Sequence, residues 1–242
     1  MTDASKNEPL QGLPPEVLAA NSRLMNALRD VAYWWIRWWL KIQFHFQVEG
    51  GEVFRRTPQF ILISNHTSHL DAICLLAALP SEQRNRCYSA AAEDYFYTNV
   101  VKEWVVRLLA NTFPFSRHAD PRSGLEACAR ILERGDSLIF FPEGTRSTTG
   151  EMQRFRKGIG ILVQGTRYPV VPVYLLGTGE ALAKGRCYPT ATKIRLRVGE
   201  PETFERAPAG DESMAKLTAR LEARVRKLGG RTADTHGGPD ER

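Results

Sequence analysis

The chain has 242 residues, of which 43% are hydrophobic and 25% are charged. This composition excludes a largely disordered or fibrous protein, and the length is sufficient to bury a hydrophobic core. Lys and Arg outnumber Asp and Glu by 33 to 27, which gives a formal net charge of +6. This modest basic excess suits an anionic membrane surface or a phosphorylated substrate but establishes neither. We expect no nucleic-acid partner.

Neither cysteine spacing nor the N-terminus indicates a secreted or membrane-spanning protein. Cys74, Cys87, Cys128 and Cys187 lie far apart without a C-x-x-C pair, so we expect a reducing, cytosol-facing compartment. The opening residues, MTDASKNEPLQGLPPEV, lack the basic and apolar regions of a signal peptide. No run of about 18 uncharged apolar residues predicts a transmembrane helix.

The composition changes along the chain and predicts four regions. Residues 1–15 and 229–242 are polar and rich in Pro or Gly, and we expect both to be disordered. Residues 16–41 are expected to form an amphipathic, membrane-associating helical segment. Residues 42–228 contain no repeat and no Pro/Ser linker, so they are expected to form one domain.

The helical segment is unusually rich in tryptophan. Four of the five tryptophans fall within six residues: Trp34, Trp35, Trp38 and Trp39. On a helix, four charged residues share one stripe: Arg23, Asp30, Arg37 and Lys41. One Trp would be expected to pack on the domain's own core, but four adjacent ones cover a wider arc than a small domain can bury. Because Trp favours the lipid headgroup boundary, we expect this helix to lie at an anionic membrane surface.

Downstream, short apolar strands alternate with helices. Residues 42–48 alternate apolar and polar side chains, which predicts a strand with His45 on its polar face. The other expected elements are strands at 59–64, 136–141, 170–177 and 194–198, and helices near 71–80, 95–109, 121–135, 157–166 and 212–228. This alternation predicts an α/β fold in which a mixed sheet is flanked by helices. In such folds, ligands bind at the carboxyl ends of the strands.

Two polar loops begin where apolar strands end: SNHTSHLD at 64–71 and PEGTRS at 142–147. His66, His69 and Asp71 in the first loop are possible metal ligands. Their H-x-x-H-x-D spacing differs from the helical H-E-x-x-H pair, however, and a further ligand such as His118 or Glu143 would be needed. We therefore expect no metal, and a metal-dependent hydrolase is the less favoured alternative.

The favoured interpretation uses His66 and Asp71 as a base and its orienting carboxylate. A histidine just past a strand, with a carboxylate five residues later at the start of a helix, can accept a proton at one ring nitrogen while the other donates to the carboxylate. Without a G-x-S-x-G nucleophile, the proton should come from a substrate hydroxyl. The competing interpretation is a packed histidine and a carboxylate favoured by the helix dipole.

The second loop supplies groups suited to a phosphorylated ligand. Gly144 allows close approach of the backbone, and Arg146 suits a bidentate phosphate contact. Glu143 can accept hydrogen bonds from substrate hydroxyls. The alternative is a surface turn with a Glu–Arg pair.

These residues resemble the glycerolipid acyltransferase family, typified by 1-acylglycerol-3-phosphate acyltransferase. NHTSHLD is similar to the family's N-H-x-S-x-x-D block, and NTFPFSR resembles the second block, with Arg117 at the position of its arginine. FPEGTRS matches the third block, and VPVYLLG, with Pro172, matches the fourth. The four blocks occur in the family's order over about residues 42–200, which makes the resemblance specific.

The resemblance implies an acyltransferase-like fold and transfer of a fatty acyl group from a thioester, on coenzyme A or acyl carrier protein, to a hydroxyl of a lysophospholipid. The acceptor would be 1-acylglycerol-3-phosphate, giving phosphatidic acid, with no cofactor and no acyl-enzyme. His66 would take the hydroxyl proton and Asp71 would orient His66, whereas His69 would only begin a helix. The implied substrate-binding residues are Asn65, Ser68, Arg117, Glu143, Gly144, Thr145 and Arg146. The protein would associate with the cytoplasmic face of a membrane.

Two positions depart from the family pattern. Asn111 stands where the family often has glycine, and AAAEDYF has no lysine where the family carries one. Another lysolipid acceptor is therefore an open alternative.

Overall fold

The computed structural model describes residues 23–92, 105, 108–115, 121–183, 186, 188–205 and 210–230. The predicted disordered N-terminus, nearly all of the predicted disordered tail and most of the helix expected near 95–109 lie outside these residues. Arg117 and His118 lie outside them as well.

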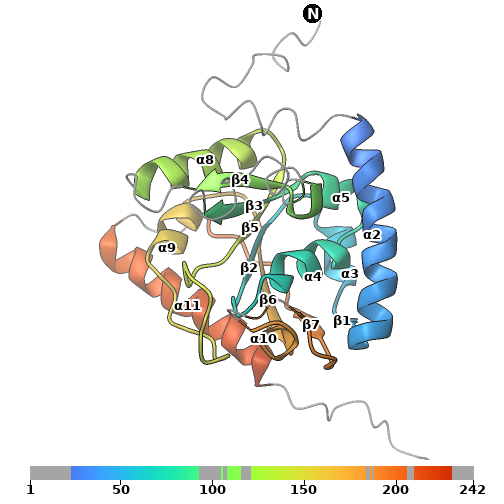
Figure 1. Cartoon of the computed structure of the whole chain (residues 1–242). Coiled ribbons are helices and arrows are strands. Elements are labelled where there is room, and N and C mark those ends of the chain that lie inside the picture. Colours follow the sequence, from blue (N-terminus) through green and yellow to red (C-terminus); the bar gives the residue numbers. More distant parts are fainter. Residues whose placement is uncertain are drawn as a thin grey trace, which may run out of the picture.

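The described helices and strands follow one another along the chain as shown in Figure 1. They are α2 (Arg23–Phe44), β1 (Gln47–Glu49), α3 (Glu52–Arg56), β2 (Ile61–Ser64), α4 (Leu70–Ala78), α5 (Ser81–Asn85), β3 (Cys87–Ala92), β4 (Thr112–Phe115), α8 (Pro121–Glu133), β5 (Ser137–Phe140), α9 (Gly158–Val163), β6 (Val170–Leu176), α10 (Thr178–Ala181), β7 (Arg195–Val198) and α11 (Asp211–Gly229).

Within the described residues, seven strands form one sheet in the order β1-β7-β6-β2-β5-β3-β4. The pairs from β6 across to β4 are all parallel. β7 runs antiparallel to β6, and β1 pairs in parallel with β7. The predicted α/β class with a mixed sheet is therefore confirmed. β2 ends with Ser64 opposite Val173, and β6 continues to Leu176; because the two strands are parallel, the loops after them lie at the same edge of the sheet.

Helices cover both faces of the sheet (Figure 1). Successive residues of β2 point to opposite sides: Leu62 packs in the core under α2, α3 and α4, while Ile61 and Ile63 pack in the core under α8, α9 and α11. A central strand covered on both sides reads as a continuous apolar run, which explains the sequence Phe60-Ile61-Leu62-Ile63. This burial makes β2 a rigid support for the loop that follows it.

The predicted strand at 42–48 is mostly wrong. Helix α2 continues to Phe44, and β1 begins only at Gln47. Leu40 and Phe44, four residues apart, are both fully buried, so they extend the helical face beyond Lys41. His45 has a positive φ of 47° and belongs to the turn between the two elements. The prediction failed because the apolar residues at 42–48 fit two patterns: they alternate as in a strand, and Phe44 also continues the helical spacing that begins at Leu40.

Helix α2 packs on the domain through a partly charged face. Arg29 and Tyr33 are fully buried, and Asp30 accepts a hydrogen bond from Arg84 at 2.7 Å. Arg37 donates to the main-chain carbonyls of Ala77 and Leu79 near the end of α4. The predicted polar stripe therefore partly faces the protein, and α2 is integral to the domain rather than a separate segment ending at residue 41.

The outer face of α2 is apolar. Its large exposed hydrophobic residues recur at helical spacing: Leu24, Leu28, Val31, Trp34, Trp35, Trp38, Trp39 and Ile42. Of the helices that the structure describes, none combines the length and apolarity required to cross a membrane.

Several short elements were not predicted. Helices α3, α5 and α10 and strands β3 and β4 have no strong periodicity of their own. β3 contains Ser89 and three alanines, and it is recognisable as a strand only through its pairing with β5 and β4.

Candidate active site

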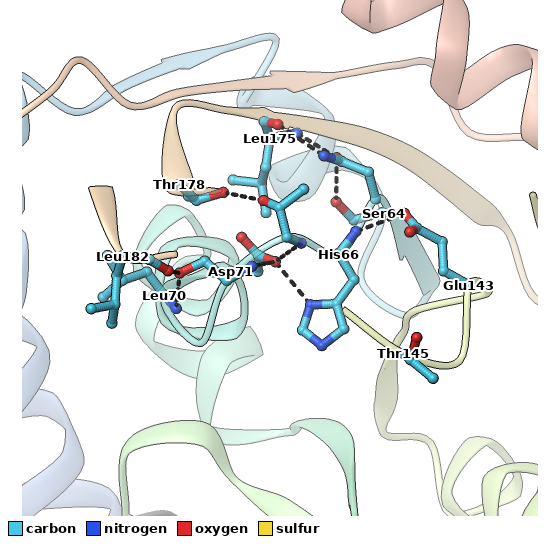
Figure 2. Close-up of polar contacts among 12 residues, drawn as sticks. Ser64, His66, Leu70, Asp71, Glu143, Thr145, Leu175, Thr178 and Leu182 are labelled. Atoms are coloured by element: carbon cyan, nitrogen blue, oxygen red, sulfur yellow. Dashed lines mark hydrogen bonds and ion pairs between the residues drawn. The ribbon is translucent and has the colours of Figure 1, made fainter. Parts of the chain in front are cut away.

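The structure brings His66 and Asp71 into direct contact at the carboxyl end of β2. The distance between Nδ1 of His66 and Oδ2 of Asp71 is 2.8 Å (Figure 2). His66 lies in the loop between β2 and α4, and Asp71 is in the first turn of α4. The five-residue spacing closes this contact because the chain turns sharply from strand to helix.

Asp71 is fully buried and is held by the turn that it closes. Its Oδ2 also accepts the backbone N–H groups of Thr67 at 2.7 Å and Ser68 at 2.8 Å. A buried carboxylate requires such donors, and the N–H groups of the loop just before α4 supply them. The orientation of the carboxylate toward His66 is therefore set by backbone atoms.

The contact with Asp71 determines which nitrogen of His66 is basic. A carboxylate oxygen can only accept, so Nδ1 carries the proton and Nε2 keeps its lone pair. The imidazole stacks on Phe141, with ring centroids 4.0 Å apart, and its side chain keeps 21% of its surface exposed. Figure 2 shows the ring extending from the loop on the side away from Thr178 and Leu175. The Nε2 of an imidazole that is oriented in this way and partly exposed can accept a proton from a bound hydroxyl.

Asn65 and Ser68, which the resemblance assigned to substrate binding, are instead bonded within the protein. Both side chains are buried. The Asn65 amide donates to the carbonyl of Leu175 at 2.9 Å and accepts the N–H of the same residue at 2.8 Å. The Ser68 hydroxyl donates to the carbonyl of Leu182 at 2.8 Å. They anchor the loop to β6 and to the end of α10, so direct contact with a substrate does not agree with this structure.

Glu143 is also turned inward. Only 3% of the residue is exposed. Its Oε1 accepts the backbone N–H of His66 at 2.8 Å, and its Oε2 accepts that of Gln153 at 3.2 Å. Burial raises the pKa of the Glu143 carboxyl to about 7, an effect that outweighs the two hydrogen bonds. Both oxygens of the Glu143 carboxylate are therefore engaged by backbone N–H groups.

The rest of the second loop wraps around an arginine. Gly144 has a φ of 74°, and a Cβ atom there would lie 2.7 Å from Nε of Arg156. That Nε donates to the carbonyl of Glu143 at 3.0 Å. The lack of a side chain at Gly144 thus allows the Arg156 side chain to lie against the backbone of the loop. Thr145 and Arg146 are partly exposed at the same sheet edge. The structure gives no position for Arg117.

A cavity of about 440 Å³ lies beside Thr67 at the carboxyl ends of β2 and β6. It is lined by Thr67 and by residues 147–151, 174–177, 179, 180 and 183. The lining contains two carboxylates, of Glu151 and Glu180, and has no Lys or Arg among the described residues. Neither His66 nor Arg146 lines this cavity.

The alternative metal interpretation lacks a ligand set in the described part of the chain, where no three His, Cys, Asp or Glu side chains converge. Cys74, one turn after Asp71, is fully buried. Burial and the charge of Asp71 raise the pKa of its thiol, so it is poorly suited to act as a nucleophile.

Sequence reasoning missed the supporting contacts around His66. The N–H of Ser147 donates to the carbonyl of His66 at 2.8 Å, and Phe141 stacks on its ring. Thr67 and Thr178 share a hydrogen bond of 3.0 Å between their hydroxyls. The only signal for Phe141 and Ser147 was their place at the two ends of the FPEGTRS block.

The chain matches the family described as Acyltransferase over residues 45–176. It is 34% identical to a chloroplastic 1-acyl-sn-glycerol-3-phosphate acyltransferase of Brassica napus, over 52% of this chain and 35% of that protein. It is 25% identical to 1-acyl-sn-glycerol-3-phosphate acyltransferase alpha of Mus musculus, over 66% of this chain and 55% of that one. The chain thus spans between about a third and a little over half of the length of these curated relatives.

A solved structure is similar over most of the chain. The crystal structure of the 1-acyl-sn-glycerophosphate (LPA) acyltransferase PlsC from Thermotoga maritima superposes with a TM-score of 0.63 and 26% identity, covering 88% of this chain and 81% of that one. The matched residues 45–176 include His66, Asp71 and the whole 142–147 loop, and make up more than half of the chain. This chain therefore belongs to the acyltransferase family.

Proposed function

We propose that this protein transfers a fatty acyl group from a thioester to the free hydroxyl of 1-acylglycerol-3-phosphate, giving phosphatidic acid. The donor is an acyl group on coenzyme A or on acyl carrier protein. The relatives are named for acyltransferases acting on this acceptor. The observation that carries the proposal is the His66–Asp71 pair, in which Nδ1 is engaged by the carboxylate and the side chain of His66 is partly exposed.

The geometry supports a direct transfer. As the acceptor oxygen attacks the thioester carbonyl carbon, its proton passes to Nε2 of His66, and the buried carboxylate of Asp71 stabilises the imidazolium that forms. The C–S bond then breaks, and Nε2–H returns the proton to the departing thiolate. The products are the new ester and the free thiol, and the reaction requires neither an acyl-enzyme nor a cofactor.

The phosphate of the acceptor is assigned to Arg146 and Arg117. Arg146 follows β5 at the same sheet edge as His66, and a guanidinium suits a bidentate phosphate contact. Arg117 comes two residues after β4, whose carboxyl end lies at the same edge because β4 is parallel to β3 and β3 to β5.

The outer face of α2 is assigned to a membrane. Trp34, Trp35 and Trp38 are each more than half exposed, at 62%, 56% and 55%. An apolar face of this size, with exposed Arg23 and Lys41 at its two ends, suits an anionic lipid surface. Contact with lipid suits this chemistry, because the lysolipid acceptor resides in the bilayer. We place the protein at the cytoplasmic face, since the thioester donors are cytosolic.

A second candidate is the same transfer to a lysolipid with a neutral or cationic headgroup. The segment AAAEDYF favours it, because it has no lysine where the family carries one and contains Glu93 and Asp94.

A matrix of assays tests both candidates. Purified protein is mixed with vesicles containing one lysolipid at a time, with phosphate, neutral or amine headgroups, and with either acyl-coenzyme A or acyl carrier protein as donor. Product is followed by mass spectrometry. Phosphatidic acid as the preferred product supports the first candidate, and preference for another headgroup supports the second. If no lysolipid is acylated by either donor, the proposed function is wrong.

A further inference from the structure

The segment from Phe141 to Ser147 holds His66 from three sides. The backbone N–H of His66 donates to Oε1 of Glu143 at 2.8 Å. The carbonyl of His66 accepts the N–H of Ser147 at 2.8 Å. Phe141 stacks on the imidazole at 4.0 Å with an interplanar angle of 18°. Main chain and ring are therefore both fixed by a loop that lies far away in the sequence.

In the 141–147 segment, the carboxylate of Glu143 connects the loop that contains His66 with the loop that contains Gln153. Its second oxygen accepts the backbone N–H of Gln153 at 3.2 Å, and the residue is only 3% exposed. A substrate hydroxyl cannot reach a side chain that is enclosed in this way. Figure 2 shows the Glu143 carboxylate directed at the backbone of the His66 loop, opposite the side on which Asp71 meets the ring.

We infer that Glu143 is a positioning residue for the base: it acts on acyl transfer through the backbone N–H of His66, by setting where Nε2 lies, and does not bind the acceptor. The inference rests on the proposed acyl transfer and adds a role within it. Asp71 sets the rotation of the imidazole, and Glu143 sets the position of the main chain that carries it.

The two N–H groups explain why a glutamate is needed. Each requires an acceptor, and a carboxylate offers one oxygen to each. A glutamine offers one oxygen and would turn its NH₂ group toward the other N–H. An aspartate keeps both oxygens but is one methylene shorter. The surrounding backbone is itself fixed, because Arg156 donates to the carbonyls of Glu143 and Pro142 through its Nε and its backbone N–H.

The test compares Glu143→Gln with Glu151→Gln. Glu151 lies in the same stretch of chain, is exposed, and undergoes the same chemical change without touching His66. For Glu143→Gln we expect kcat to fall on the order of 10²-fold, as a displaced catalytic group does, with KM for the lysolipid unchanged. For Glu151→Gln we expect a much smaller effect on kcat. A raised KM with kcat retained would show that Glu143 binds substrate, and an unchanged kcat would also overturn the inference.

A second measurement does not depend on activity. In ¹⁵N-labelled protein, the backbone amide and imidazole signals of His66 should shift in Glu143→Gln and stay in place in Glu151→Gln. If the wild-type protein acylates no lysolipid, the proposed function fails, and these signals still test the contact. If Glu143→Gln does not fold, Glu143→Asp is measured in its place. Wild-type kcat and unshifted His66 signals in that variant would overturn the inference.

Discussion

Asp71 accepts the Nδ1–H of His66 at 2.8 Å while two backbone N–H groups hold the same carboxylate oxygen. The base is therefore oriented by a carboxylate that cannot rotate away without losing all three bonds. This relationship gives the most direct test of the site.

Replacing His66 by Ala should lower kcat by on the order of 10²–10⁴-fold or more, because the hydroxyl proton then has no acceptor in the protein. The fold should survive, since the imidazole is partly exposed. His69→Ala is the control, as no role in the chemistry is assigned to it. The rate of acyl transfer is measured at a saturating concentration of donor. A wild-type kcat in His66→Ala would contradict the assignment of His66 as the base.

Asp71→Asn should lower kcat by on the order of 10²–10⁴-fold, because the neutral amide no longer stabilises the imidazolium. An Asn oxygen can still accept the N–H groups of Thr67 and Ser68, so the turn should persist. Asp211→Asn, an exposed first-turn carboxylate of α11, is the matched control. Equal kcat values for both variants and the wild type would remove Asp71 from the mechanism.

Changing Trp35 and Trp38 together to Glu should weaken binding to anionic vesicles at least tenfold, since each tryptophan contributes about 1–2 kcal/mol of burial in the lipid boundary. Both are more than half exposed, at 56% and 55%, so folding should be unaffected. Tyr188→Glu is the control, because it changes another exposed aromatic, at 84%, in the segment between α10 and β7. Deleting α2 would be uninformative because Tyr33 and Leu40 belong to the core. Unchanged co-sedimentation of the double variant would refute the membrane role of this face.

Glu143 should make stability depend on pH near neutrality. Burial raises the pKa of its carboxyl from an ordinary 4.5 to about 7. The folded state then holds a proton that the unfolded state has released, so the free energy of unfolding should fall as pH rises from about 4.5 and level off above about 7. The total loss is roughly 3 kcal/mol. The free energy of unfolding is measured with urea at pH 5, 6, 7 and 8. It should fall with rising pH in the wild type and fall less in Glu143→Gln. An equal pH dependence in both proteins would contradict the prediction.

Asn111→Gly should destabilise the protein by about 1–2 kcal/mol. Asn111 has a φ of 44°, which glycine adopts more easily. Its side chain, however, accepts from the buried Arg29 at 3.2 Å and donates to the carbonyl of Cys87 at 2.9 Å. Loss of these bonds should outweigh the relief of strain. Thermal unfolding measures the balance, and a stabilised variant would show that strain dominates.

Much of the site could be read from local sequence. An apolar run followed by a polar loop predicts a strand end, and the spacing of five residues from His66 to Asp71 brings them together within one turn of chain. The α/β class followed in the same way from alternating periodicities. These features depend on interactions between residues that are close in the sequence, and they can therefore be predicted from it.

The roles of Asn65, Ser68 and Glu143 were decided by residues far away in the chain. Asn65 meets Leu175, 110 residues later, Ser68 meets Leu182, 114 residues later, and Glu143 reaches back 77 residues to His66. The sequence shows that a side chain can accept or donate a hydrogen bond. It does not show whether the polar atoms of that side chain are already bonded to backbone groups of the folded protein.

Helix α2 shows the same division. Its sequence alone predicted an amphipathic helix rich in tryptophan. Only the packed structure decided that Arg29, Tyr33 and Phe44 face the domain while the tryptophans face outward, because a side chain's environment depends on which surfaces meet it. The sequence by itself determined the chemical groups and their local order; the tertiary structure decided which of those groups remain accessible to a substrate or a membrane, since burial and hydrogen bonding are properties of the packed chain.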